Sequence, residues 1–182
     1  MHLGIVGHEA KKFTPETQRC ARRIIRSAIT NFQADLVVSG HSPLGGIDWW
    51  AIEEAQGMGV ETREHPPGVL QWHGVAGVDG FMERNLKIAA DSALVLCIVV
   101  QELPPDYRGM EFADGCYHCK TPPADHIKSG GCWTVKAARR LGKPTVTAVV
   151  DSSGGFSCRN SNMNSRPAPL SRPAWTQASF RT

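Results

Sequence analysis

Residues 36–48 read LVVSGHSPLGGID, a short apolar run followed by a glycine-rich turn and the start of a helical pattern. This passage from strand to turn to helix is typical of a parallel sheet, where a helix returns the chain after each strand. The helix predicted after the turn covers about residues 47–56 and ends at Gly57 and Gly59. The turn is therefore expected at the carboxyl end of a strand, where open parallel sheets bind ligands.

The same alternation continues on both sides of this stretch. Further strands are predicted at residues 2–6, 60–65, 93–100 and 144–150, and further helices at about 15–31, 81–90 and 131–141. Thr14 and Pro15 are expected to begin the first helix as N-cap and first helical residue. We therefore predict an α/β protein with a Rossmann-like open parallel five-stranded sheet and helices on both faces.

Two segments fall outside this pattern. Residues 101–129 are rich in proline and poor in aliphatic residues, which indicates an inserted loop in a single domain spanning residues 1–150. Residues 151–182 shift to Ser, Asn, Gly, Pro and Arg, which is typical of a polar, basic, low-complexity tail. Trp175 and Phe180 leave a second possibility open, in which the tail docks on the body or on another subunit.

Composition and charge exclude several classes of protein. The chain has 182 residues, of which 41% are hydrophobic and 20% charged, as in globular proteins. No apolar run approaches the ~20 residues of a membrane span, and the start of the chain does not resemble a signal peptide. A cytoplasmic protein without a membrane partner is expected. The net charge is +3, but residues 152–182 carry four arginines and no acid. The rest of the chain therefore has almost no net charge, which disfavours a nucleic-acid partner.

A second glycine pair, Gly130 and Gly131, precedes the helix predicted at residues 131–141. Backbone N–H groups at helix N-termini bind anions, and glycines let the backbone approach the anion closely. Each glycine turn also carries a hydroxyl group, that of Ser42 in the first and that of Thr134 in the second. Two such turns in equivalent positions predict a phosphorylated ligand.

Three segments occur in a recognisable order: residues 39–48 (SGHSPLGGID), residues 84–91 (RNLKIAAD) and residues 130–134 (GGCWT). In these motifs and their spacing the chain resembles the SLOG superfamily, the Rossmann-like group that contains DprA and the lysine-decarboxylase-like LOG proteins. The resemblance covers about residues 1–150. It implies a sensor or binding module whose partner is a nucleotide or a nucleotide-derived small molecule.

The resemblance also implies roles for individual residues. Asp48 would orient the first turn, although the helix dipole alone accounts for an acid at that place. Arg84 would face phosphate or ribose, although a surface pair with Glu83 or a nearby acid is an alternative. His41, inside the first turn, is a further candidate for phosphate contact or acid catalysis. The complete set of expected ligand-binding residues is Gly7, His41, Ser42, Gly45, Gly46, Asp48, Arg84, Asn85, Gly130, Gly131 and Thr134.

Catalysis is less expected than binding. Phosphoribohydrolases of this superfamily continue the second turn with two glutamates, whereas residues 135–137 here are Val, Lys and Ala. The alternative function, an N-glycosidic hydrolase or transferase acting on a nucleotide, would need another carboxylate, for which Glu9 is the catalytic candidate. A second alternative, DprA-like binding of single-stranded DNA, requires a basic stripe with aromatic residues that residues 1–150 do not show.

The insertion carries a separate motif. Cys116, Cys119, His126 and Cys132 have spacings close to those of a Cys3His zinc site, with His118 as an alternative to His126. We expect a structural zinc ion that joins the insertion to the second glycine turn. The alternative is that Cys132 is only a small residue of the turn and the other two cysteines are free thiols.

Two adjacent tryptophans, Trp49 and Trp50, start the helix after the first turn. Neighbouring positions on a helix face different directions, so one ring is expected in the core. The other ring is available to stack on a base or to seal a subunit interface. A homo-oligomer is also expected.

Overall fold

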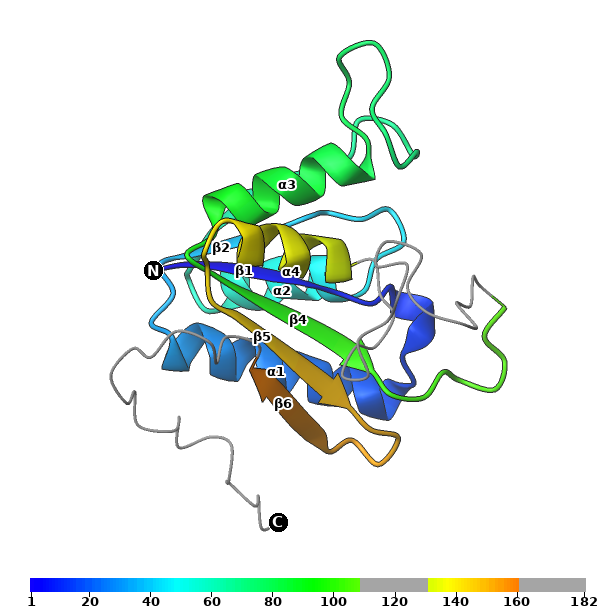
Figure 1. Ribbon diagram of the computed structural model, residues 1–182. Helices are drawn as coiled ribbons and strands as arrows, with labels where there is room; N and C mark the ends of the chain where they lie inside the picture. Colours follow the sequence, from blue (N-terminus) through cyan, green and yellow to red (C-terminus); the bar gives the residue numbers. More distant parts are fainter. Residues whose placement is uncertain (109–130, 161–182) are drawn as a thin grey trace.

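The computed structural model describes residues 1–108 and 131–160, which form one mixed sheet with helices packed around it (Figure 1). The strands are β1 (His2–Gly7), β2 (Leu36–Ser39), β3 (Glu61–Glu64), β4 (Leu94–Val100), β5 (Thr145–Val150) and β6 (Phe156–Asn160). Their order is β3-β2-β1-β4-β5-β6, with the first five parallel and β6 antiparallel to β5. The predicted Rossmann-like α/β fold is confirmed.

The helices are α1 (Pro15–Asn31), α2 (Ile47–Gly57), α3 (Phe81–Asp91) and α4 (Gly131–Arg140), with a short 3-10 helix η1 (Ala10–Lys12) after β1. The predicted start of α1 is confirmed. Thr14 Oγ1 accepts the Thr17 N–H at 3.2 Å, and Thr17 Oγ1 accepts the Thr14 N–H at 2.9 Å. This capping box satisfies two N–H groups that the helix cannot pair itself. Within the described ranges no helix is both long and apolar enough to cross a membrane.

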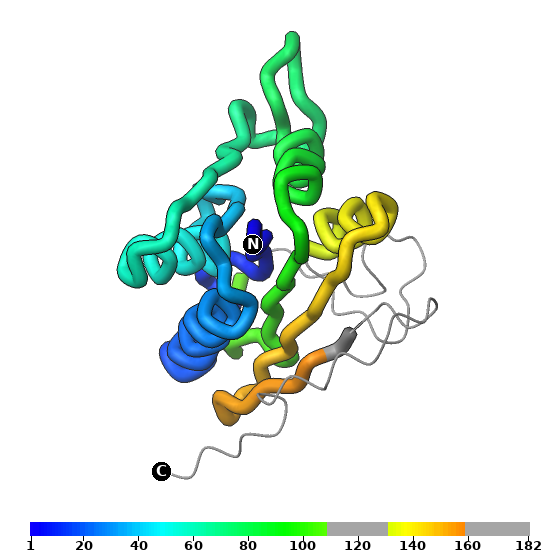
Figure 2. Tube along the Cα trace, turned by 90° about the vertical axis from the view of Figure 1, so that its left-hand side faces the viewer, coloured from blue at the N-terminus to red at the C-terminus, as the bar shows by residue number. Residues whose placement is uncertain are grey.

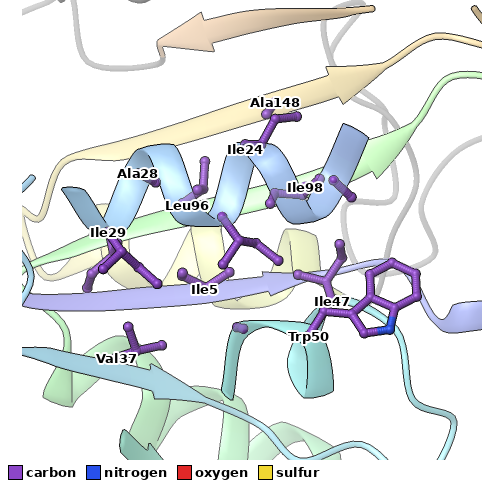
Figure 3. Packing of buried hydrophobic residues seen from close by; sticks show 14 of the residues in the cluster. Ile5, Ile24, Ala28, Ile29, Val37, Ile47, Trp50, Leu96, Ile98 and Ala148 are labelled. Carbon is purple, nitrogen blue, oxygen red and sulfur yellow. The ribbon is translucent and has the colours of Figure 1, made fainter. Parts of the chain in front are cut away.

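Apolar side chains on both faces of the sheet form two core layers. On one face, strand residues such as Ile5, Leu96 and Ile98 pack against α1 and α2 (Figure 3). On the other face, Val95 and Val99 pack against α3 and α4. Figure 2 shows α1 and α2 on one side of the strands and α3 and α4 on the other. The central strands β1 and β4 are therefore buried on both faces, as their continuous apolar sequences require.

The sixth strand comes from the segment that the composition assigned to a tail. Asp151 Oδ1 accepts the N–H groups of Ser153 and Gly155, both at 2.9 Å, and this tight turn reverses the chain. The strand β6 then pairs with β5, and Cys158 packs against the core. Burial raises the pKa of the Cys158 thiol to about 11. The boundary predicted at residue 150 was too early, because a polar edge strand has the composition of a loop.

The strand order places a ligand crevice between β1 and β4. Strand β1 pairs with β2 on one side and with β4 on the other. The connections that leave β1 and β4 therefore run to opposite faces, which opens a crevice at the carboxyl ends of these strands. The connection from β3 to α3, residues 65–80, projects beyond the N-terminal end of α3 (Figure 1).

Candidate functional site

A cavity of about 320 Å³ opens at the carboxyl ends of β1 and β4. It lies between the end of β1, the glycine turn before α2, the start of α3 and the start of α4. Most of the ligand-binding residues expected from the sequence meet there, although they come from distant parts of the chain. Those that line the cavity are Gly7, Ser42, Gly45, Asp48, Arg84, Asn85, Gly131 and Thr134, and the catalytic candidate Glu9 lines it too.

Two expected residues within the described part of the chain, Gly46 and His41, are not part of this lining. Gly46 has a φ of 86°, and a Cβ there would lie 2.4 Å from the carbonyl oxygen of His8, so this glycine lets the turn pack against the backbone. His41 bonds to the Glu64 carboxylate through Nδ1, and its ring lies 4.8 Å from that of Trp49. Gly130 lies outside the described residues, as do Cys116, Cys119 and His126.

The carboxylate of Asp48 lies beside the first glycine turn. Asp48 Oδ2 accepts Arg84 Nη1 at 2.9 Å, and both Asp48 and Ser42 line the cavity. Burial raises the pKa of Asp48, and the neighbouring Arg84 opposes this rise. Gly40 makes room for the pair, since a Cβ there would lie 1.8 Å from Arg84 Nη1. A buried ion pair therefore lies beside the first glycine turn, and Ser42 and Gly45 of that turn line the cavity with it.

The acid that pairs with Arg84 is Asp48, and the pair is buried and not on the surface. Its Nε donates to Asn85 Oδ1 at 3.0 Å and its Nη1 to Asp48, so protein groups already engage the guanidinium. Glu83, the alternative partner, instead accepts the N–H groups of Gly74 and Gly80, both at 3.0 Å. Arg84 borders the cavity mainly as a structural element that joins α3 to the first turn of α2.

The N-terminus of α3 is also closed by protein groups. The Phe81 N–H donates to the carbonyl of Gln71 and the Met82 N–H to the carbonyl of Trp72, both at 2.8 Å. These bonds satisfy donors that would otherwise attract an anion. These two N–H groups of helix α3 are therefore already engaged by protein carbonyls.

The N-terminus of α4 is different. Gly131 lines the cavity, and a Cβ on it would lie 2.9 Å from Cys97 Sγ, so only glycine allows the helix to start this close to the sheet. Thr134 is completely buried, lines the same cavity, and its Oγ1 has no hydrogen-bond partner among the described residues. A buried hydroxyl without a partner is uncommon and costly. Helix α4 thus presents an unused donor and the positive end of its dipole to the cavity.

A cluster of polar residues faces α4 from the end of β1. The Tyr107 hydroxyl donates to Glu9 Oε1 at 2.6 Å, and Lys12 Nζ lies 5.6 Å from the centre of the Tyr107 ring. Burial lowers the pKa of Lys12, while the charge of Glu9 opposes this shift. His8 Nδ1 accepts the Val100 N–H at 3.1 Å, which leaves the proton of a neutral ring on Nε2. The cluster offers a carboxylate, a phenol and an amine to one ligand.

Several residues of the lining were missed by sequence reasoning. His8 had a usable signal, because it follows Gly7 at the end of the first predicted strand, but an isolated histidine near a turn is usually solvated. Lys12 and Leu44 have no distinguishing pattern. Trp72, Phe81 and Tyr107 come from irregular segments or their edges, whose course no periodicity reveals.

The adjacent tryptophans divide as predicted. Trp50 is buried in the core, where its ring lies 4.9 Å from that of Phe13 in an edge-to-face contact. Trp49 remains 42% exposed, and its indole N–H donates to the carbonyl of Ser42 at 2.6 Å. Trp49 thus supports the first glycine turn from outside the cavity.

No protein-family model matches the chain, and no curated protein matches it. Among solved structures, the chain is similar to the X-ray structure of DNA processing protein A (DprA) from Streptococcus pneumoniae, with 16% sequence identity and a TM-score of 0.48. The similarity covers 79% of this chain and 48% of that chain, so this chain spans about half the length of its structural neighbour. Strand order and cavity together define a Rossmann-like α/β protein with a candidate site at the switch point of its sheet.

Proposed function

We propose that this chain binds a nucleotide or a nucleotide-derived ligand in the cavity and acts as a sensor or binding module. The observation that carries the proposal is Thr134 in the first turn of α4, which lines the cavity and whose buried hydroxyl has no partner among the described residues. A phosphate oxygen supplies the acceptor that this hydroxyl lacks, and it also suits the N–H groups of the helix N-terminus.

Charge balance supports α4 as the anion position. Among the residues that the structure describes, the charged lining residues are two cations, Lys12 and Arg84, and two acids, Glu9 and Asp48. Arg84 is paired with Asp48, and Lys12 lies in the field of Glu9. Affinity for an anion would then depend on oriented backbone donors and the Thr134 hydroxyl more than on excess positive charge.

A thermal-shift panel tests the proposal. It would compare nucleoside mono- and diphosphates, ribose 5-phosphate and inorganic phosphate, with sodium sulfate at equal ionic strength as control. A ligand present at 100 times its Kd stabilises the folded state by about 2.7 kcal/mol, which is measurable as a rise in Tm. We expect nucleotides to raise Tm beyond the sulfate control. Equal Tm values across the whole panel would refute nucleotide binding.

Glu9 favours a second candidate function, N-glycosidic bond hydrolysis or transfer. Its carboxylate borders the cavity and is held at 2.6 Å by the Tyr107 hydroxyl. A positioned carboxylate is the group that stabilises an oxocarbenium-like centre. Release of free base from nucleoside monophosphates, measured by chromatography, tests this candidate. Base release that requires the protein and disappears in Glu9→Gln would establish an enzyme, and release at the background rate would reject it.

Structural zinc remains a proposal based on the cysteine spacing. Cys132 is buried in the first turn of α4, two residues before Thr134. A zinc ion bound by Cys132, Cys116, Cys119 and His126 would fasten the insertion to the α4 end of the cavity. Four protein ligands leave no coordination position for a catalytic water, so the ion would be structural.

A homo-oligomer also remains a proposal. Leu70 and Val75, in the projecting connection between β3 and α3, are 69% and 50% exposed. Exposed apolar side chains that gather in one segment are typical of interaction surfaces. Light scattering coupled to gel filtration would measure the mass in solution. A homo-oligomer should have a mass of two or more times the 19.8 kDa of one chain.

A further inference from the structure

We infer that Trp72 is the platform on which a planar ring of the ligand stacks, so that it selects ligands carrying a heteroaromatic base. The inference rests on the proposed function, because it concerns a second part of the same ligand. Trp72 lines the cavity and is half-buried, whereas its neighbours Gln71 and His73 are exposed. The chain thus turns this one large aromatic side chain inward from an otherwise solvated segment.

The backbone around Trp72 is fixed by several hydrogen bonds. Its carbonyl accepts the Met82 N–H at 2.8 Å, next to the equivalent bond from Phe81 to Gln71. The Glu83 carboxylate holds the two ends of the following loop through the N–H groups of Gly74 and Gly80. A platform anchored in this way loses little conformational freedom when a ligand binds.

The indole ring is oriented by a second tryptophan. Trp72 and Trp133 have ring centroids 5.5 Å apart and planes at 82°, an edge-to-face arrangement that favours a defined orientation. Trp133 directly precedes Thr134 in the first turn of α4. The stacking platform therefore contacts the same helix turn that carries the proposed anion position, and both Trp72 and Thr134 line the one cavity.

Phe81, another aromatic residue of the cavity lining, contacts the buried ion pair. The Arg84 guanidinium lies 5.6 Å from the centre of the Phe81 ring, in a cation–π contact, and its Nη1 is held by Asp48. Phe81 therefore supports the ion pair between α2 and α3. Trp72 has the larger ring system, and base–aromatic stacking contributes to affinity for any base because every base has a π-face.

The experiment compares AMP with ribose 5-phosphate, which lacks the base, by isothermal titration on three variants. Trp72→Leu removes the ring, Trp72→Phe keeps a smaller one, and Phe156→Leu removes an exposed ring that is not part of the cavity lining. We expect Trp72→Leu to weaken AMP by on the order of 10-fold to 100-fold and to leave ribose 5-phosphate within about 2-fold. Trp72→Phe should lose less, and Phe156→Leu should match the wild type.

The outcomes separate this inference from the proposed function. Equal losses for AMP and ribose 5-phosphate in Trp72→Leu, or no loss for either, would overturn the stacking role while nucleotide binding stands. Absence of binding to wild-type protein by both ligands would overturn both. If Trp72→Leu does not fold, as judged by its Tm, fluorescence decides instead. AMP should quench the tryptophan emission of the wild type and not that of Trp72→Phe, and equal quenching in both would contradict the inference.

Discussion

Arg84 Nη1 lies 2.9 Å from Asp48 Oδ2, and the two side chains are only 10% and 6% exposed. This ion pair connects α3 to the first turn of α2 across the carboxyl edge of the sheet. It also lies directly against the first glycine turn, since a Cβ on Gly40 would meet both Arg84 Nη1 and Asp48 Oδ2. The pair therefore builds one wall of the cavity.

Replacing only one member of this pair should lower the free energy of unfolding, because the other member is left as a buried charge without its partner. Asp48→Asn and Arg84→Gln are each expected to lower the free energy of unfolding by about 3–5 kcal/mol. The double variant should lose much less than the sum of the two single losses. Urea unfolding of all four proteins checks this, and strictly additive losses would show that the pair contributes no coupling.

Gly40→Ala should act on the same pair without touching its charges. A Cβ at this position would lie 1.8 Å from Arg84 Nη1 and 2.5 Å from Asp48 Oδ2, so the guanidinium must move. We expect a loss of about 1–3 kcal/mol in the free energy of unfolding. Gly57→Ala is the matched control, because nothing lies within 4 Å of its added Cβ. An equal effect of the two substitutions on urea unfolding would contradict the close packing described at Gly40.

The contact between α1 and α2 should make stability depend on pH. Burial opposes ionisation of Glu54, but hydrogen bonds from Arg22 and Arg26, at 2.8 and 2.7 Å, outweigh it and lower the pKa of Glu54. A lowered folded-state pKa stabilises the protein above the unfolded-state value of about 4.3, and this contribution disappears as the pH falls further.

Glu54→Gln should therefore cost up to ~1 kcal/mol at pH 7 and almost nothing at about pH 3. Thermal unfolding across that range measures the difference from wild type. Glu61→Gln, on the exposed side of β3, serves as the control. A difference that stays constant with pH would refute the role of the Glu54 carboxylate.

The zinc proposal predicts about one zinc ion per chain by elemental analysis. Cys119→Ser should lose the metal while residues 1–108 keep their fold, as judged by circular dichroism and a cooperative unfolding transition. Cys158→Ser, in β6 and outside the proposed ligand set, should retain it. Metal-free wild-type protein prepared without chelator would reject the site.

The parts of the fold that depend on local periodicity were predictable. The apolar run of β4 and the capping residues of α1 give direct signals, and the glycine turns locate the carboxyl edge of the sheet. The sixth strand was not predictable from composition, because its pairing depends on a turn made by the Asp151 side chain and on the open edge of β5.

The candidate site was predicted in part. Positions at strand ends, such as Gly7 and Ser42, reach the cavity because the sheet brings them there. The sequence could not reveal that Asp48 pairs with Arg84, since this pair depends on the distance between α2 and α3. Nor could it place Trp72 or Tyr107, because irregular segments follow tertiary contacts and show no period.

The most direct test of nucleotide binding at the N-terminus of α4 is an isothermal titration of AMP into wild type and Thr134→Val, with Thr62→Val on β3 as control. Valine has nearly the shape of threonine and removes a buried hydroxyl that has no partner among the described residues. Thr134→Val should keep or raise Tm, because an unsatisfied buried polar group costs about 1–3 kcal/mol. It should also weaken AMP by on the order of 10-fold, the loss of one hydrogen bond to a charged group. Equal AMP affinity in wild type and Thr134→Val would contradict the anion position at the N-terminus of α4.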